Sequence, residues 1–169
     1  IKVQTVKKEE LEVAAQVLRP WQANLYSNVI ENSLSSFNVT WIYDKLGDTG
    51  KTWFCHQFLA KKNDMFTYQY FNDLSEFKFK LSIFGPVVNG IFIDICRAEG
   101  HRLESSDSMD IYYLVEFIIK ELKMSCPIVL FANILPNLRY LSLSKWQVFD
   151  IVNGELAVHK FKNAELSSL

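Results

Sequence analysis

The stretch YDKLGDTGKTWF, residues 43–54, joins a β-branched, apolar run to a helical pattern. The run at 39–44 predicts a strand, and residues 50–62 predict a helix that begins at the turn. A strand, a glycine-containing turn and a helix N-terminus bring several backbone N–H groups around one point, and such a point binds phosphate. The candidate phosphate-binding residues are Gly47, Asp48, Thr49, Gly50, Lys51 and Thr52.

The end of this stretch fits the pattern G-x-x-x-x-G-K-[ST] of nucleotide-binding loops. In that pattern the lysine, here Lys51, binds the β- and γ-phosphates, and the hydroxyl of Thr52 binds Mg²⁺. The first glycine of the pattern is replaced by Lys45, which requires a different backbone angle at this position. The stretch therefore predicts a site for ATP and Mg²⁺, and the alternative is a strand–turn–helix corner that binds nothing.

Two later apolar runs also end in polar residues. Asp94 closes the apolar part of GIFIDI (90–95), and Asn133 closes PIVLFAN (127–133). Because α/β sheets bind ligands at the carboxyl ends of their strands, we expect Asp94 to complete the Mg²⁺ shell and Asn133 to orient the attacking water. Arg97, which follows Asp94 closely in the sequence, is a candidate for an auxiliary residue of the same site. Alternatively, these residues only end a strand and start a turn.

The rest of the chain alternates between strand-like and helix-like patterns. We expect strands at 39–44, 65–71, 90–95, 127–133 and 146–152, with a short edge strand within 155–161. Alternation of this kind predicts an α/β fold with a mainly parallel sheet flanked by helices. Residues 1–36 have helical periodicity and predict a small helical subdomain, so that the α/β domain covers 37–169.

Composition limits the class of protein. Apolar residues make up 49% of the chain and the formal net charge is −1, so a packed core is expected and the overall charge gives no case for nucleic-acid binding. Three cysteines without a pairing pattern favour a reducing compartment, and the adjacent Cys55 and His56 do not predict a zinc site. Apolar runs are too short to span a membrane, and the missing initial Met suggests a fragment. We expect the indoles of Trp41, Trp53 and Trp146 in the core, and the alternative for an aromatic side chain near the loop is contact with adenine.

Taken in order, the motifs GDTGKTW, IFIDICR, YYLVE, VLFANILPN and LSLSKWQVFDI resemble the superfamily 3 helicase domain of replication-associated (Rep) proteins. These proteins belong to circular single-stranded DNA viruses and related plasmids, and the resemblance covers about residues 18–153. It implies an AAA+-like P-loop ATPase that forms a hexameric ring, hydrolyses ATP with Mg²⁺ and translocates on single-stranded DNA. It also implies a separate nicking endonuclease domain in the full-length protein, and a location in the host nucleus or cytoplasm, with the nucleus favoured.

Carried over by the resemblance, Lys51 and Thr52 are the Walker A pair, Asp94 is the Walker B carboxylate and Asn133 is the sensor asparagine. Glu116 ends the helical motif Y-x-x-x-E, which begins at Tyr112. Lys145 stands where the family has an arginine that would act on the ATP of a neighbouring subunit, and a lysine lacks the planar fork of arginine.

The segment between the Glu116 helix and the strand at 127–133 is too short for the usual DNA-gripping hairpin, either because it is short in this protein or because a piece of it is absent from the sequence. Lys120, Lys123, His101 and Arg102 would substitute poorly for its lysine and aromatic residues. Two alternatives to the helicase motor therefore stay open. One is a degenerate Rep-like domain that binds nucleotide or partners without unwinding DNA, and the other is a P-loop NTPase or kinase acting on a small molecule.

Overall fold

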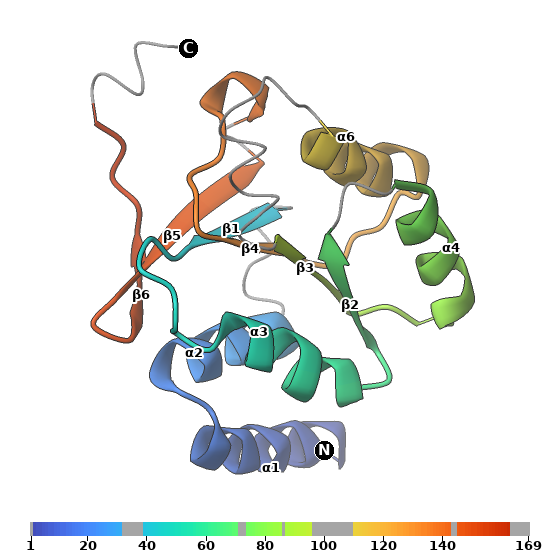
Figure 1. Cartoon of the computed structure of the whole chain (residues 1–169). Coiled ribbons are helices and arrows are strands. Elements are labelled where there is room, and N and C mark those ends of the chain that lie inside the picture. The colour runs from blue at the N-terminus through green and yellow to red at the C-terminus, as the bar shows by residue number, and fades with distance from the viewer. Residues whose placement is uncertain are drawn as a thin grey trace.

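The computed structural model describes residues 2–31, 39–70, 74–85, 87–95, 110–142 and 145–162. One sheet runs through the middle of the molecule, with helices on both of its faces (Figure 1). The main helices are α1 (Lys2–Val17), α2 (Pro20–Ile30), α3 (Lys51–Trp53), α4 (Leu74–Phe84) and α6 (Asp110–Glu116). The strands are β1 (Val39–Tyr43), β2 (Met65–Tyr70), β3 (Gly90–Ile95), β4 (Ile128–Ala132), β5 (Trp146–Val152) and β6 (Glu155–Val158).

The strand order is β2-β3-β4-β1-β5-β6. Every neighbouring pair from β2 to β5 is parallel, and β6 returns antiparallel to β5 at the edge. The predicted α/β fold, with a mainly parallel sheet flanked by helices and a short last edge strand, is therefore confirmed. Since β1, β3 and β4 run in the same direction, the residues that follow them emerge at one edge of the sheet.

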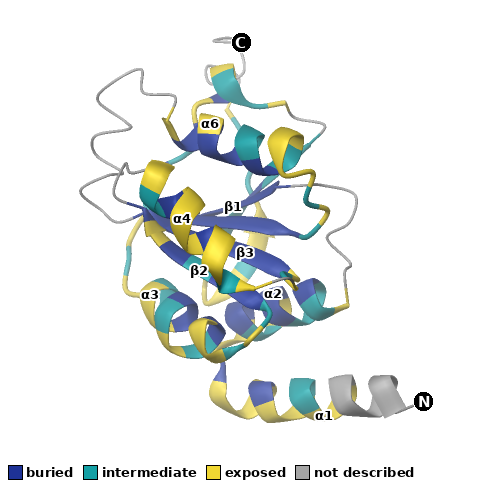
Figure 2. Cartoon of the chain, turned by 90° about the vertical axis from the view of Figure 1, so that its right-hand side faces the viewer, coloured by how far each residue is buried: buried dark blue, intermediate teal, exposed yellow. Residues whose placement is uncertain are grey.

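The two faces of the sheet bury separate apolar clusters. Side chains of β1 alternate between them, so Trp41 faces the cluster under α4 and α6, whereas Ile42 faces the cluster under α1 and α2. The central strands β1, β3 and β4 are the most continuously buried part of the chain, and Figure 2 shows β1 and β3 in the colour of buried residues. Helix α2 packs directly on the sheet through Trp21 and Leu25. The predicted boundary at residue 36 lies within 32–38, outside the described residues.

The helix after the loop is irregular. It begins as α3, continues as a π-helical turn, η1 (Phe54–Phe58), and ends as a 3₁₀ turn, η2 (Leu59–Lys61). Phe54 and Leu59 are fully buried, but Trp53 is 42% exposed. The expectation that Trp53 is a core residue was wrong, because a helix rotates about 100° per residue and Phe54 already occupies the direction of the core.

The two other tryptophans that we expected in the core are buried. Trp41 is fully buried, and Trp146 is 3% exposed. The first helices also match the sequence pattern, since α2 begins at Pro20, whose fixed backbone angle suits the first helical position. Two more short helical turns, η3 (Phe117–Glu121) and η4 (Leu138–Tyr140), complete the described elements.

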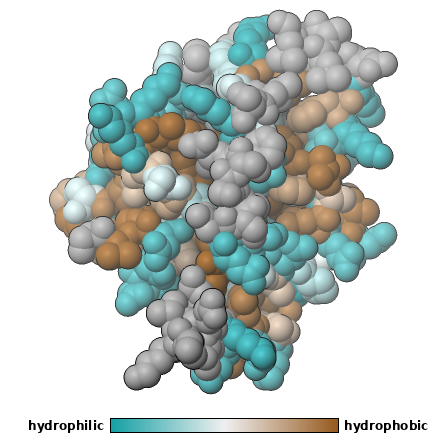
Figure 3. Space-filling model, turned by 180° about the vertical axis from the view of Figure 1, so that it is seen from behind, coloured by the Kyte–Doolittle hydropathy of each residue, from teal (hydrophilic) through white to brown (hydrophobic). Residues whose placement is uncertain are grey.

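The surface seen from behind carries hydrophobic and hydrophilic side chains side by side in the part drawn in colour (Figure 3). None of the helices in the described ranges is both long enough and apolar enough to cross a membrane.

Candidate functional site

The loop between β1 and α3 has an unusual backbone. Gly47, Asp48 and Gly50 have positive φ angles of 81°, 57° and 92°. Glycine adopts this left-handed region without cost, and Asp tolerates it better than most residues. Lys45 is not among the residues with positive φ, so the position where the usual pattern has glycine does not need one here. Turns of this kind point successive N–H groups into one concave space.

A carboxylate of the chain itself lies inside this loop. Asp44, the residue directly after β1, accepts hydrogen bonds from the Gly47 amide at 3.2 Å and the Thr49 hydroxyl at 2.7 Å. The ammonium group of Lys51 pairs with the same carboxylate at 2.8 Å, and the Asp44 side chain is only 3% exposed. The loop is therefore arranged around an anion.

The protonation of Asp44 follows from these contacts. Burial by itself raises its pKa, but the hydrogen bonds from Lys51 and Thr49, the charge of Lys51 and the Gly47 amide together outweigh burial. The net result is a pKa below the ordinary value, so Asp44 is charged at neutral pH.

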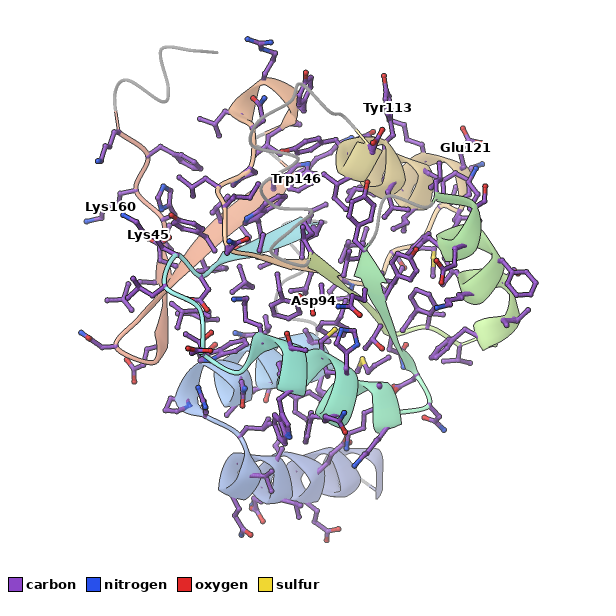
Figure 4. The ribbon with its side chains drawn as sticks, in the orientation of Figure 1. Lys45, Asp94, Tyr113, Glu121, Trp146 and Lys160 are labelled. Carbon is purple, nitrogen blue, oxygen red and sulfur yellow. The ribbon has the colours of Figure 1, made fainter. Side chains whose placement is uncertain are left out.

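Asp94 lies on β3 with its side chain directed toward α3 (Figure 4). One of its oxygens accepts a hydrogen bond from the Thr52 hydroxyl at 3.4 Å and is 3.1 Å from Nε2 of His56. The residue is 4% exposed. Nearby, burial and then the charge of Asp94 raise the pKa of the Cys55 thiol well above its usual value, so Cys55 stays protonated.

The residues present fit Mg²⁺, which prefers hard oxygen ligands and commonly takes only one or two carboxylates together with substrate phosphates. Thr52 and Asp94 supply a hydroxyl and a carboxylate within hydrogen-bonding distance of each other. In the described parts of the chain no three His, Cys, Asp or Glu side chains gather as a metal-binding group. A site of this kind would therefore be completed by the phosphates of a ligand.

Asn133 follows β4, which lies between β1 and β3, so it emerges between the loop and Asp94. The segment after it is held by the core: Trp41 donates to the Ile134 carbonyl at 3.0 Å, and the Asn137 amide donates to the Tyr112 hydroxyl at 2.7 Å. The side-chain oxygen of Asn133 is buried and has no hydrogen-bond partner among the described residues. Leaving a buried acceptor unpaired costs about 1–3 kcal/mol, and this cost is offset when a ligand or water binds it.

The other predicted residues lie elsewhere. Lys145 precedes β5, and its carbonyl accepts from the amide of Val39, the first residue of β1, so it stands at the opposite edge of the sheet from the loop. Glu116 forms an ion pair of 2.9 Å with Lys120 on the face covered by α6. Arg97, His101 and Arg102 lie outside the described residues.

Sequence reasoning did not select Asp44 or His56. Asp44 carries the same signal as Asp94 and Asn133, because it too is a polar residue at the carboxyl end of a buried apolar run. His56 had no such signal, since its position beside Asp94 depends on how the π-helical turn η1 faces β3.

A cavity of about 550 Å³ opens at the other edge of the sheet, where β2 begins with Met65 and Pro127 precedes β4. Its lining includes Lys123 but no residue of the loop at 47–52, and neither Asp94 nor Asn133. We place the candidate site at the carboxyl edge instead, because polar groups from several strands converge there.

Comparison with family models, curated proteins and solved structures found no match to this chain.

Proposed function

We propose that the loop at residues 47–52 binds the triphosphate of ATP and that the chain is the ATPase motor of a Rep-type replication initiator that moves on single-stranded DNA. The observation that carries the proposal is the convergence of Lys51, Thr52, Asp94 and Asn133 at one edge of a parallel sheet. The loop already surrounds one anion, the carboxylate of Asp44, and phosphate presents the same kind of charged oxygens.

Each residue then has a definite part. The backbone N–H groups of the loop bind phosphate oxygens, and Lys51 leaves Asp44 to pair with the β- and γ-phosphates. Asn133 uses its buried side-chain oxygen to accept a hydrogen bond from the attacking water. Electrostatic stabilisation and positioning of this kind supply most of the catalysis in phosphoryl transfer.

Thr52 and Asp94 would hold Mg²⁺. When bound, the ion would neutralise charge on the phosphate oxygens. His56 hydrogen-bonds the same Asp94 oxygen, which fixes the orientation of the carboxylate relative to Thr52.

A second function is favoured by one specific observation. The ion pair between Asp44 and Lys51 closes the loop on itself, and ATP must displace it before the lysine can bind phosphate. If this displacement leaves Lys51 poorly placed, the chain is a nucleotide-binding domain without turnover, as expected for a degenerate Rep-like domain.

The test is ATP hydrolysis with and without single-stranded DNA, compared between the wild type and Lys51→Ala. We expect steady turnover in the wild type and none above background in the variant, because the lysine contacts the phosphates directly. ATP binding without turnover in the wild type would favour the second function. Turnover that Lys51→Ala leaves unchanged would refute the assignment of the loop.

A further inference from the structure

We propose that the first turn of α2 is the positioning element of the phosphate-binding loop, and that it acts by binding the loop's carbonyl groups from outside. Three consecutive carbonyls accept from side chains at the start of α2, where Arg19 is the N-cap residue: Asp48 from Arg19 at 3.2 Å, Thr49 from Trp21 at 2.9 Å and Gly50 from Gln22 at 3.1 Å. This inference rests on the proposed function of the loop.

The direction of these bonds matters because the peptide unit is planar and trans. In each unit the C=O and the following N–H point to opposite sides. Carbonyls turned outward to α2 therefore direct the N–H groups of Thr49, Gly50 and Lys51 away from α2, toward the side on which the proposed phosphate would bind. Without the side chains at the start of α2, the Gly50 carbonyl would keep only the Phe54 amide, which donates to it at 3.0 Å. A loop with several left-handed residues could then rotate its peptide units and lose the concave set of donors.

Gln22 is central to this arrangement. Its side-chain oxygen accepts from the Arg19 amide at 2.9 Å, and its side-chain nitrogen donates to the Gly50 carbonyl, so the two ends of one amide serve the helix and the loop. The residue is 1% exposed, which leaves it little freedom to turn. A side chain at Gly50 would meet the Gln22 nitrogen at 2.8 Å, so the loop approaches α2 as closely as glycine allows.

Trp21 is held equally firmly. Its ring packs edge-on against Phe54 and Phe131, with centroid distances of 5.5 Å and 6.1 Å, and it is 1% exposed. Its backbone amide donates to the carbonyl of Gly154 in the β5–β6 turn at 3.1 Å. The loop is thereby tied through α2 to the core and to the edge of the sheet.

The experiment compares Gln22→Met with Asn24→Met. Methionine at position 22 keeps the side-chain length but removes both hydrogen bonds of the Gln22 amide. Asn24 is the control because it lies exposed on the same helix, where its side-chain oxygen accepts from Asn28. We measure the Kd for ATP, kcat, and amide hydrogen exchange of the loop. Loss of one hydrogen bond corresponds to about a fivefold change in an equilibrium constant.

We expect Gln22→Met to weaken ATP binding about fivefold and to speed exchange of the loop amides by a similar factor. Asn24→Met should match the wild type in both measurements. ATP affinity and loop exchange at wild-type values in Gln22→Met would overturn the inference. If the wild type binds no ATP, the proposed function fails, and the exchange measurement alone decides whether α2 positions the loop.

Trp21→Phe is the second variant, for the case that Gln22→Met does not fold. Phenylalanine keeps an aromatic ring against Phe54 but removes the indole N–H that binds the Thr49 carbonyl. Faster exchange of the loop amides with a folded core supports the inference, and unchanged exchange overturns it. In the wild type, the indole ¹H–¹⁵N signal of Trp21 should shift when ATP binds, because its acceptor belongs to the loop.

Discussion

The carboxylate of Asp44 bears both on the stability of the chain and on the proposed binding of phosphate. It is buried, charged and bonded to Lys51, Thr49 and the Gly47 amide, so it is itself an anion that the loop surrounds. The same contacts make it a competitor of any phosphate for Lys51. Two opposite consequences follow for a variant that lacks the charge.

The first consequence concerns stability. Because the pKa of Asp44 is lower in the folded state, its contribution is present above the ordinary pKa of about 3.9 and is lost as the pH falls through the folded value. We expect Asp44→Asn to lower the free energy of unfolding by about 1–3 kcal/mol at pH 7. The difference from the wild type should shrink below about pH 4 in urea unfolding curves.

Asp48→Asn is the matched control for this prediction. It makes the same change of charge in the same loop, but Asp48 is exposed and its left-handed backbone suits Asn equally well. Its effect should stay within about 0.5 kcal/mol. Equal effects of the two substitutions would show that the contacts of Asp44 add nothing to the free energy of unfolding.

The second consequence concerns binding. Asp44→Asn removes the negative charge that holds Lys51, so ATP no longer has to displace an ion pair. We expect ATP to bind several-fold more tightly, roughly the factor that one charge-assisted hydrogen bond contributes. Calorimetric titration with ATP measures this directly, and weaker binding would mean that Asp44 shapes the loop rather than competes with phosphate.

At the scale of the elements, the packing of α2 against the loop depends on glycine at position 50. Gly50 needs its positive φ of 92°, and it also needs the space that a Cβ atom would take from Gln22. Gly154, in the β5–β6 turn, has a φ of 79° but open space around it. Substitutions at these two positions therefore separate the cost of backbone strain from the cost of a contact with Gln22.

We expect Gly154→Ala to cost about 1–2 kcal/mol of stability, the usual cost of a left-handed residue with a side chain. Gly50→Ala should cost more and also weaken ATP binding, because its Cβ displaces the Gln22 amide. Thermal unfolding and ATP titration of both variants provide the measurement. Equal costs in the two would mean that Gln22 moves aside freely.

For the whole molecule, the position of Lys145 bears on assembly. Lys145 lies at the opposite edge of the sheet from the loop, so it cannot serve the site of its own chain. If the proposed ring forms, it can act only on ATP bound to a neighbouring subunit. Turnover per subunit should then rise with protein concentration and with single-stranded DNA.

Lys145→Ala should remove that rise while leaving the Kd for ATP of dilute protein unchanged. Lys145→Arg should retain it, since arginine keeps the charge and binds phosphate with its planar fork. ATPase assays over a range of protein concentrations, together with ATP titrations, make the comparison. Turnover independent of concentration and DNA in the wild type would favour a monomeric small-molecule NTPase.

Much of the fold could be predicted because it depends on local pattern. The strand β3 is apolar except for Asp94, and α4 ends directly before Gly85, since both features arise from neighbouring residues alone. Trp53 was misplaced because the direction of a helix face is set by what it packs against. The π-helical turn η1 was not predicted either, for the same reason.

The sequence by itself determined the succession of strands and helices along the chain, and it identified the polar residues at the ends of β3 and β4, Asp94 and Asn133. Periodicity and strand-end chemistry are local, so they can be read without the fold. Only the tertiary structure decided that Asp44 fills the loop, that His56 meets Asp94 and that Gln22 binds Gly50. The contacts of His56 and Gln22 join separate elements, and that of Asp44 depends on how the loop folds back, so only packing of the whole chain brings them together.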